Sequence, residues 1–153
     1  MLNISSKVED ILEQKISETR VLLNLQDGFL TSFFVISGDK VTETSVDLSS
    51  MHGDELKELM KVACAGPEVS AAFLLINAFT KSYSLKDKEL IPESIEHEED
   101  KIPTVVAFFY TKDSMYIRNI TYKRRKANDY WFGDQGWKKA PDVAGRFANP
   151  FSR

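Results

Sequence analysis

The sequence predicts a two-layer α+β domain, in which two helices cover one face of a mostly antiparallel five-stranded sheet and an irregular C-terminal tail follows. Two observations support this fold class. Apolar residues recur at helical spacing in two segments and gather elsewhere in five short runs rich in Val, Ile and Phe. Glycine and proline separate these segments in the order helix, two strands, helix, three strands. The length of 153 residues predicts one core domain, at residues 1–123, followed by a tail at residues 124–153.

Two amphipathic stripes predict the helices. In the first, Ser6 and Glu9 have capping-box spacing, and apolar residues follow at steps of three and four as far as Leu23. The second helix is expected to begin within Ser50–Asp54 and to end before Gly66, which is followed by proline. Each stripe is suited to packing against a sheet.

Four of the strands are expected to form two hairpins. Phe29–Ser37 and Lys40–Leu48 flank a Gly-Asp pair that is typical of a tight turn. Thr104–Thr111 and Met115–Lys123 flank a short polar turn and are rich in Val, Ile and aromatic residues. Their alternation of apolar and polar residues indicates strands with one buried face.

The segment Val69–Tyr83 is the ambiguous one. Its almost continuous apolar run is compatible with a buried helix or with a buried central strand. We predict a strand, because the segment follows a Gly-Pro stop and the sheet needs a centre. The polar, acidic stretch Leu85–Lys101 after it is expected to be a surface loop.

Two of these segments carry a resemblance. Leu74–Phe79 and Pro92–Asp100 resemble motifs of an uncharacterised family of small bacterial and phage proteins, over about residues 5–125. The resemblance implies a strand at Val69–Tyr83. The family supplies no activity to carry over to this chain, which we expect to be a bacterial or phage accessory protein.

Charge is divided unevenly along the chain. Residues 118–153 contain nine basic and three acidic residues, a formal charge of +6, whereas the other 117 residues carry −9. The basic segment also contains aromatic residues that lie outside the periodic apolar pattern of the predicted helices and strands. We predict that it forms a binding segment, with Lys123, Arg124, Arg125, Lys126, Tyr130, Trp131, Trp137 and Lys138 as its contact residues.

Three interpretations of the tail remain open on sequence grounds. It can fold back, so that its aromatic residues cover the sheet and its cations face the acidic remainder of the chain. It can contact another protein or a second copy, because Trp, Tyr and Arg dominate interface hot spots. It can also bind nucleic acid, because cations neutralise phosphates and aromatic rings stack on unpaired bases.

We therefore expect a non-catalytic binding or accessory protein that acts through protein–protein contact or self-association, with Trp131, Trp137 and Arg125 as anchors. The alternative is a nucleic-acid-binding accessory protein that uses the basic aromatic segment. An enzyme is least supported, since the sequence contains no evident nucleophile–base pair and no cofactor motif. No catalytic residue, cofactor or metal ligand is predicted.

Three reactive residues have ordinary structural explanations. His97 lies in the acidic loop and could join a metal site with His52, but such a loop is more typical of a solvated surface. Cys64 is expected to pack in the core as a small apolar group.

With one cysteine, no signal-like segment and no apolar stretch long enough to span a bilayer, we expect a cytoplasmic protein without membrane contact.

Overall fold

The computed structural model describes residues 5–26, 31–51, 54–80, 102–126, 129–140 and 147–151. Two α-helices, one short 3-10 helix and six strands lie within them. In chain order these are α1 (Ser6–Gln26), β1 (Thr31–Ser37), β2 (Lys40–Val46), η1 (Leu48–Ser50), α2 (Glu55–Ala63), β3 (Ala71–Thr80), β4 (Ile102–Thr111), β5 (Met115–Lys126) and β6 (Asp129–Ala140).

The sheet has six strands rather than the predicted five. Its order is β2-β1-β3-β4-β5-β6, and all neighbouring strands are antiparallel. The sixth strand, β6, occupies the segment that we expected to be an irregular tail, and it pairs with β5 along its length. The predicted boundary between residues 123 and 124 lies inside β5.

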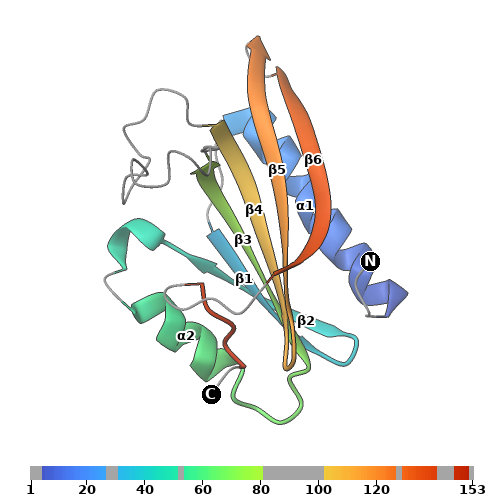
Figure 1. The fold of residues 1–153 in the computed structure, drawn as a ribbon, viewed down its shortest axis with the longest axis vertical. Helices are drawn as coiled ribbons and strands as arrows, with labels where there is room; N and C mark the ends of the chain where they lie inside the picture. The colour runs from blue at the N-terminus through green and yellow to red at the C-terminus, as the bar shows by residue number, and fades with distance from the viewer. Residues whose placement is uncertain are drawn as a thin grey trace, which may run out of the picture.

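The predicted position of the helices is wrong, because they cover opposite faces of the sheet. Val8, Leu12 and Ile16 of α1 pack in one apolar cluster with Phe73, and α2 packs in a second cluster, with Leu74 of the same strand. We call these the α1 face and the α2 face. Figure 1 shows α1 behind β5 and β6, and α2 at the lower left.

The central strand explains this three-layer arrangement. Ala71, Phe73 and Leu75 of β3 belong to the α1-face cluster, whereas the alternate residues Ala72 and Leu74 belong to the other. All are buried. A strand that is apolar on both sides needs cover on both sides, so a two-layer fold would leave one side in water.

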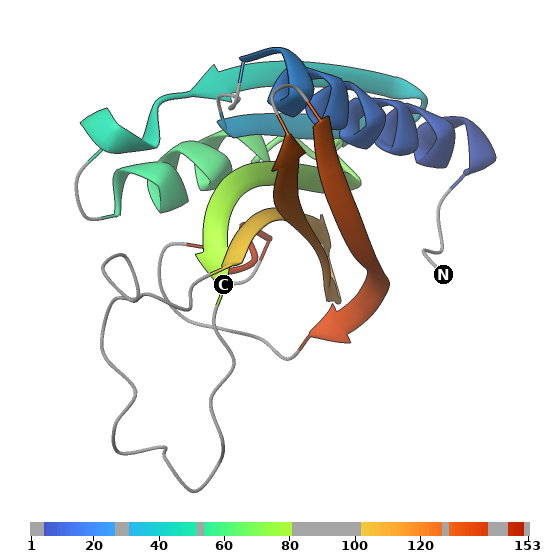
Figure 2. The same cartoon turned by 90° about the horizontal axis from the view of Figure 1, so that it is seen from above.

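The sheet curls toward the α1 face. In a flat sheet, β3 and β6 would lie about 14 Å apart. The rings of Phe73 on β3 and Trp137 on β6 nevertheless have centroids 6.1 Å apart. Figure 2 shows the strong curvature of the strands from above.

The C-terminal residues 147–151 pack on the α2 face. The Tyr110 hydroxyl donates a hydrogen bond to the Phe147 carbonyl at 2.9 Å, and the Phe108 and Phe147 rings stack. The buried Asn149 side chain donates to the Thr111 carbonyl at 2.9 Å. These contacts cover the α2 face next to the turn between β4 and β5. Residues 147–151 do not cover the opposite end of this face, where β4 begins.

Candidate functional site

A β-bulge in β6 decides which face each of its side chains occupies. Trp131 pairs with Lys123, and Trp137 pairs with Arg118. Between these pairs, β6 has two residues, Gln135 and Gly136, opposite the single Asn119 of β5. In a regular strand Trp131 and Trp137, six residues apart, would share a face. The extra residue places them on opposite faces.

Gly136 makes this bulge possible. Its φ of 72° lies in the left-handed region, where residues with a side chain are strained. Its amide donates a hydrogen bond to Asp134 Oδ1 at 2.9 Å. The Gly-Asp-Gln-Gly sequence at 133–136 therefore forms an irregularity within a strand, whereas its composition is that of a turn.

On the α1 face, Trp137 is partly buried and packs against the core. Its indole meets the rings of Phe73 and Phe109 edge-on, with centroids 6.1 and 6.3 Å apart. The Arg118 guanidinium lies over the same indole at 5.7 Å. The contacts of Trp137 thus fit the predicted alternative in which the tail aromatics cover the sheet.

The charged groups beside Trp137 tie β6 to α1. Arg118 is only 8% exposed and forms ion pairs with Glu13 of α1 and Asp134 of β6. Arg20 of α1 also contacts Asp134, with Nη2 3.1 Å from Oδ2. The hydrogen bond from Arg118 holds the pKa of Asp134 below its usual range, although burial opposes this shift. These residues are engaged in the fold.

On the α2 face, Trp131 is held at the surface. Its side chain is 53% exposed. A Cβ atom added at Gly133 would lie 3.0 Å from Cη2 of the indole and 2.9 Å from Thr121 Oγ1. The ring therefore lies across Gly133, where the absence of a side chain gives it room. The Cη2 end of the indole thus lies close to the sheet, while about half of the residue is exposed.

An open hollow of about 640 Å³ lies beside this ring. Its lining is largely apolar, and it includes the 44% exposed Ile102 at the start of β4. The residues that line it are Ile102, Pro103, Thr121, Tyr122, Lys123, Trp131 and Gln135.

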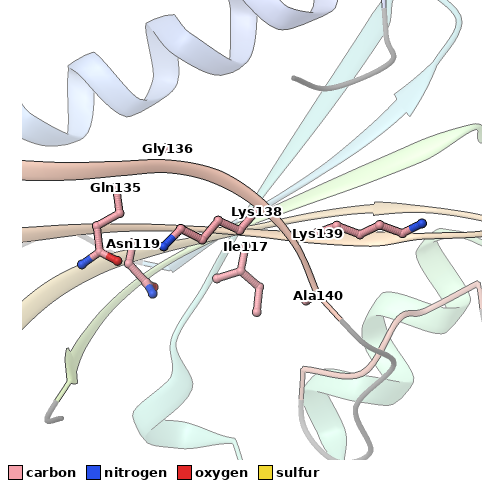
Figure 3. Close-up of a pocket in the computed structure, with 7 residues that line it drawn as sticks. All are labelled: Ile117, Asn119, Gln135, Gly136, Lys138, Lys139 and Ala140. Atoms are coloured by element: carbon pink, nitrogen blue, oxygen red, sulfur yellow. The ribbon is translucent and has the colours of Figure 1, made fainter.

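A second hollow of about 240 Å³ continues along β5 and β6 from Gln135, which lines both. Figure 3 shows the Lys138 side chain extending toward Gln135 and Asn119, while Lys139 points away from them. Ile117 lies beneath these polar groups. We call the two hollows together the Trp131 surface. It can stack on a flat ring, bind anions and form hydrogen bonds through carboxamides.

Of the eight contact residues predicted from the sequence, three meet on the Trp131 surface: Lys123, Trp131 and Lys138. Trp137 lies on the opposite face. Arg124, Arg125 and Lys126 continue β5, and Tyr130 pairs with Arg124 in β6, but the side chains of these four lie outside the described residues.

Sequence reasoning missed the polar residues between these anchors. Asn119, Thr121 and Gln135 have no motif or spacing that marks them, because they become neighbours only through the pairing of β5 with β6. The Ile102 side chain was assigned no role for the same reason. These residues could have been found only by predicting a sixth strand and its pairing with β5.

The remaining reactive residues offer no second site within the described ranges. Cys64 is buried, as predicted, and burial raises the pKa of its thiol to about 11, so it stays protonated at neutral pH. His52 and His97, together with the acidic loop, lie outside the described residues. Elsewhere in the described chain, His, Cys, Asp and Glu form no group of three or more that could hold a metal ion.

No described helix has both the length and the apolar character needed to cross a membrane. Comparison with protein-family models, curated proteins and solved structures gives no match to this chain. Function is therefore inferred from the Trp131 surface itself.

Proposed function

We propose that this chain is a non-catalytic binding protein, whose macromolecular partner docks on the Trp131 surface. The observation that supports this function is the position of Trp131, which is 53% exposed and yet held against Gly133. Tryptophan is the residue type most enriched among interface hot spots, and a ring already held in place loses little conformational freedom on binding.

The chemistry of the surface favours binding over catalysis. Its described side chains offer an indole, the ammonium groups of Lys123 and Lys138, two carboxamides and the Thr121 hydroxyl. That hydroxyl donates to the Gly133 carbonyl at 3.3 Å. These groups can stack, attract negative charge and hydrogen-bond, and none is paired with a base in the manner of a nucleophile.

Self-association through β6 is the less favoured form of this function. Strand β6 lies at an edge of the sheet, where a second copy could add a strand. However, its bulge at 135–136 and its lysines at 138 and 139 are typical of edge strands that avoid such pairing. We therefore assign docking to the face of β4, β5 and β6.

Site-specific photo-crosslinking in living cells tests the proposal. A photoreactive residue at Ile102, on the rim of the hollow, should give a discrete adduct. The same residue at Val62, which is 75% exposed on α2, serves as the matched control and should give none. Adding Trp131→Ala to the Ile102 chain should abolish the adduct. Equal products at both positions, or an adduct that survives Trp131→Ala, would contradict a partner on this surface.

A further inference from the structure

Among the described side chains, charge on the Trp131 surface is of one sign. Lys123 and Lys138 are exposed there, and the described side chains on the α2 face of β4, β5 and β6 include no carboxylate. The nearby Asp134 points to the α1 face, where Arg118 and Arg20 neutralise it. The surface is thus complementary to a polyanion, and Lys123 is followed along β5 by three more basic residues.

The exposed indole favours a single-stranded polyanion over a double-stranded one. In a duplex the faces of the bases are stacked on one another, so they are not available to a protein ring. In a single strand they can stack on aromatic side chains, and this contact tolerates any base sequence. The Trp131 indole lies close to Gly133 and the residue is 53% exposed, so it offers aromatic surface on which a base can stack.

The distance along β6 suits a short segment of single strand. From Trp131 to Lys138 the strand rises about 20 Å. The two hollows fill this interval, and Gln135 lines both of them. Such a path accommodates about four nucleotides, at the lower end of the site sizes of single-strand-binding domains.

We propose that the partner is a single-stranded nucleic acid, an inference that rests on the proposed docking surface. One base stacks on Trp131, Lys123 beside it contacts a phosphate at that end of the path, and Lys138 contacts a phosphate at the other end. The carboxamides of Gln135 and Asn119 lie between these contacts, where they can hydrogen-bond to bases or sugars. The side chains described on this surface form no fixed array of donors that would read one sequence, so we infer binding with little sequence preference.

Fluorescence polarisation with the full chain tests this inference. The probes are a labelled oligothymidylate, a labelled oligouridylate and a labelled duplex of mixed sequence, at low and at near-physiological salt. We expect both single strands to bind more tightly than the duplex, with affinity that falls steeply as salt rises. Trp131→Ala should weaken single-strand binding about tenfold or more, and Trp131→Phe should recover part of it.

The lysines provide a second readout. Lys123→Gln and Lys138→Gln should each lower the slope of log affinity against log salt by about 0.7, the value for one phosphate contact on a single strand. Lys40→Gln, on the exposed edge strand β2, removes the same charge far from the site and should leave the slope unchanged. A slope altered equally by all three variants would overturn the assignment of these lysines.

The outcomes separate the two proposals. If the full chain binds neither single-stranded probe, or binds the duplex equally well, the nucleic-acid inference fails. The crosslinking experiment then decides the proposed function independently, because a protease-sensitive, nuclease-resistant adduct from Ile102 would show that the surface serves a protein partner. Wild-type affinity in a folded Trp131→Ala chain would also sink the stacking role.

Discussion

The two tryptophans of β6 differ in their surroundings although they lie on one strand. Trp137 contacts Phe73, Phe109 and the Arg118 guanidinium on the α1 face. Trp131 is 53% exposed on the α2 face and rests across Gly133. The single extra residue of the β-bulge places the two tryptophans on opposite faces of the sheet. A single strand can therefore pack against the core with one face and expose an aromatic, basic surface on the other.

The charged residues follow the same division. On the α1 face, acids and bases neutralise one another: Glu13 and Asp134 are paired with Arg118. On the α2 face, Lys123 and Lys138 have no carboxylate beside them among the described side chains of β4 to β6. Composition alone counts all these residues as one basic aromatic tail, whereas strand pairing separates residues that form ion pairs on the α1 face from lysines that are exposed on the α2 face.

The largest effect is expected from removing the bulge. Deleting Gly136 would turn either Trp137 or Trp131 to the wrong face, since one residue of shift exchanges the faces of a strand. We expect a loss of more than about 3 kcal/mol in the free energy of unfolding, measured in urea. Gly136→Ala keeps the chain length and should cost only about 1–2 kcal/mol, from its positive φ. A deletion variant as stable as the substituted one would break the comparison.

Truncating the two rings sharpens the comparison. Trp137→Ala should lower the free energy of unfolding by about 3 kcal/mol, because it removes the contacts of the indole with the buried rings of Phe73 and Phe109. Trp131→Ala should change it by less than about 0.5 kcal/mol, as expected for a surface position. Urea unfolding of both variants, followed by circular dichroism, measures the difference. Similar losses in the two would show that Trp131 is also structural.

A smaller, pH-dependent effect is expected at Asp134. Its pKa is held below the ordinary value of 3.8, chiefly by Arg118, so its ionised form stabilises the fold. This stabilisation is present above the ordinary pKa and is lost as the pH falls through the lowered one. Because solvent screens this partly exposed carboxylate, Asp134→Asn should be less stable than wild type by about 0.5–1 kcal/mol at about pH 5, and the gap should narrow at about pH 3. A gap that stays constant over this range would contradict the ion pair.

Local sequence signals predicted much of the fold. The predicted segments match α1, α2 and the first five strands closely, because each has a clear apolar period and ends at Gly, Pro or a polar turn. The observed helix cap differs by one residue, since Ser5 rather than Ser6 accepts the amide hydrogen bond, from Val8. Such boundaries depend on one weak contact and are hard to read from a pattern.

Local sequence signals did not reveal two features of the fold, strand β6 and the second covered face of the sheet. Strand β6 was missed because Gly133 and Gly136 are typical of turns and the bulge interrupts its alternation. The second face was missed although β3 contained a clue. Its continuous apolar run from Ala71 to Ile76 is the pattern of a strand buried on both sides, which requires a third layer. Both errors concern tertiary pairing, and that pairing also determines which tail residues meet at the Trp131 surface.

The fluorescence of single-tryptophan chains tests the central claim most directly. Trp137→Phe keeps a ring in the core and leaves Trp131 as the sole tryptophan; Trp131→Phe does the reverse. On adding an unlabelled single-stranded oligonucleotide at low salt, we expect saturable quenching in the first chain, reversed by salt, because a base stacks on the indole. The second chain should show no change. Quenching that requires Trp137, or no quenching in either folded chain, would contradict a division of β6 into a structural face and a nucleic-acid-binding face.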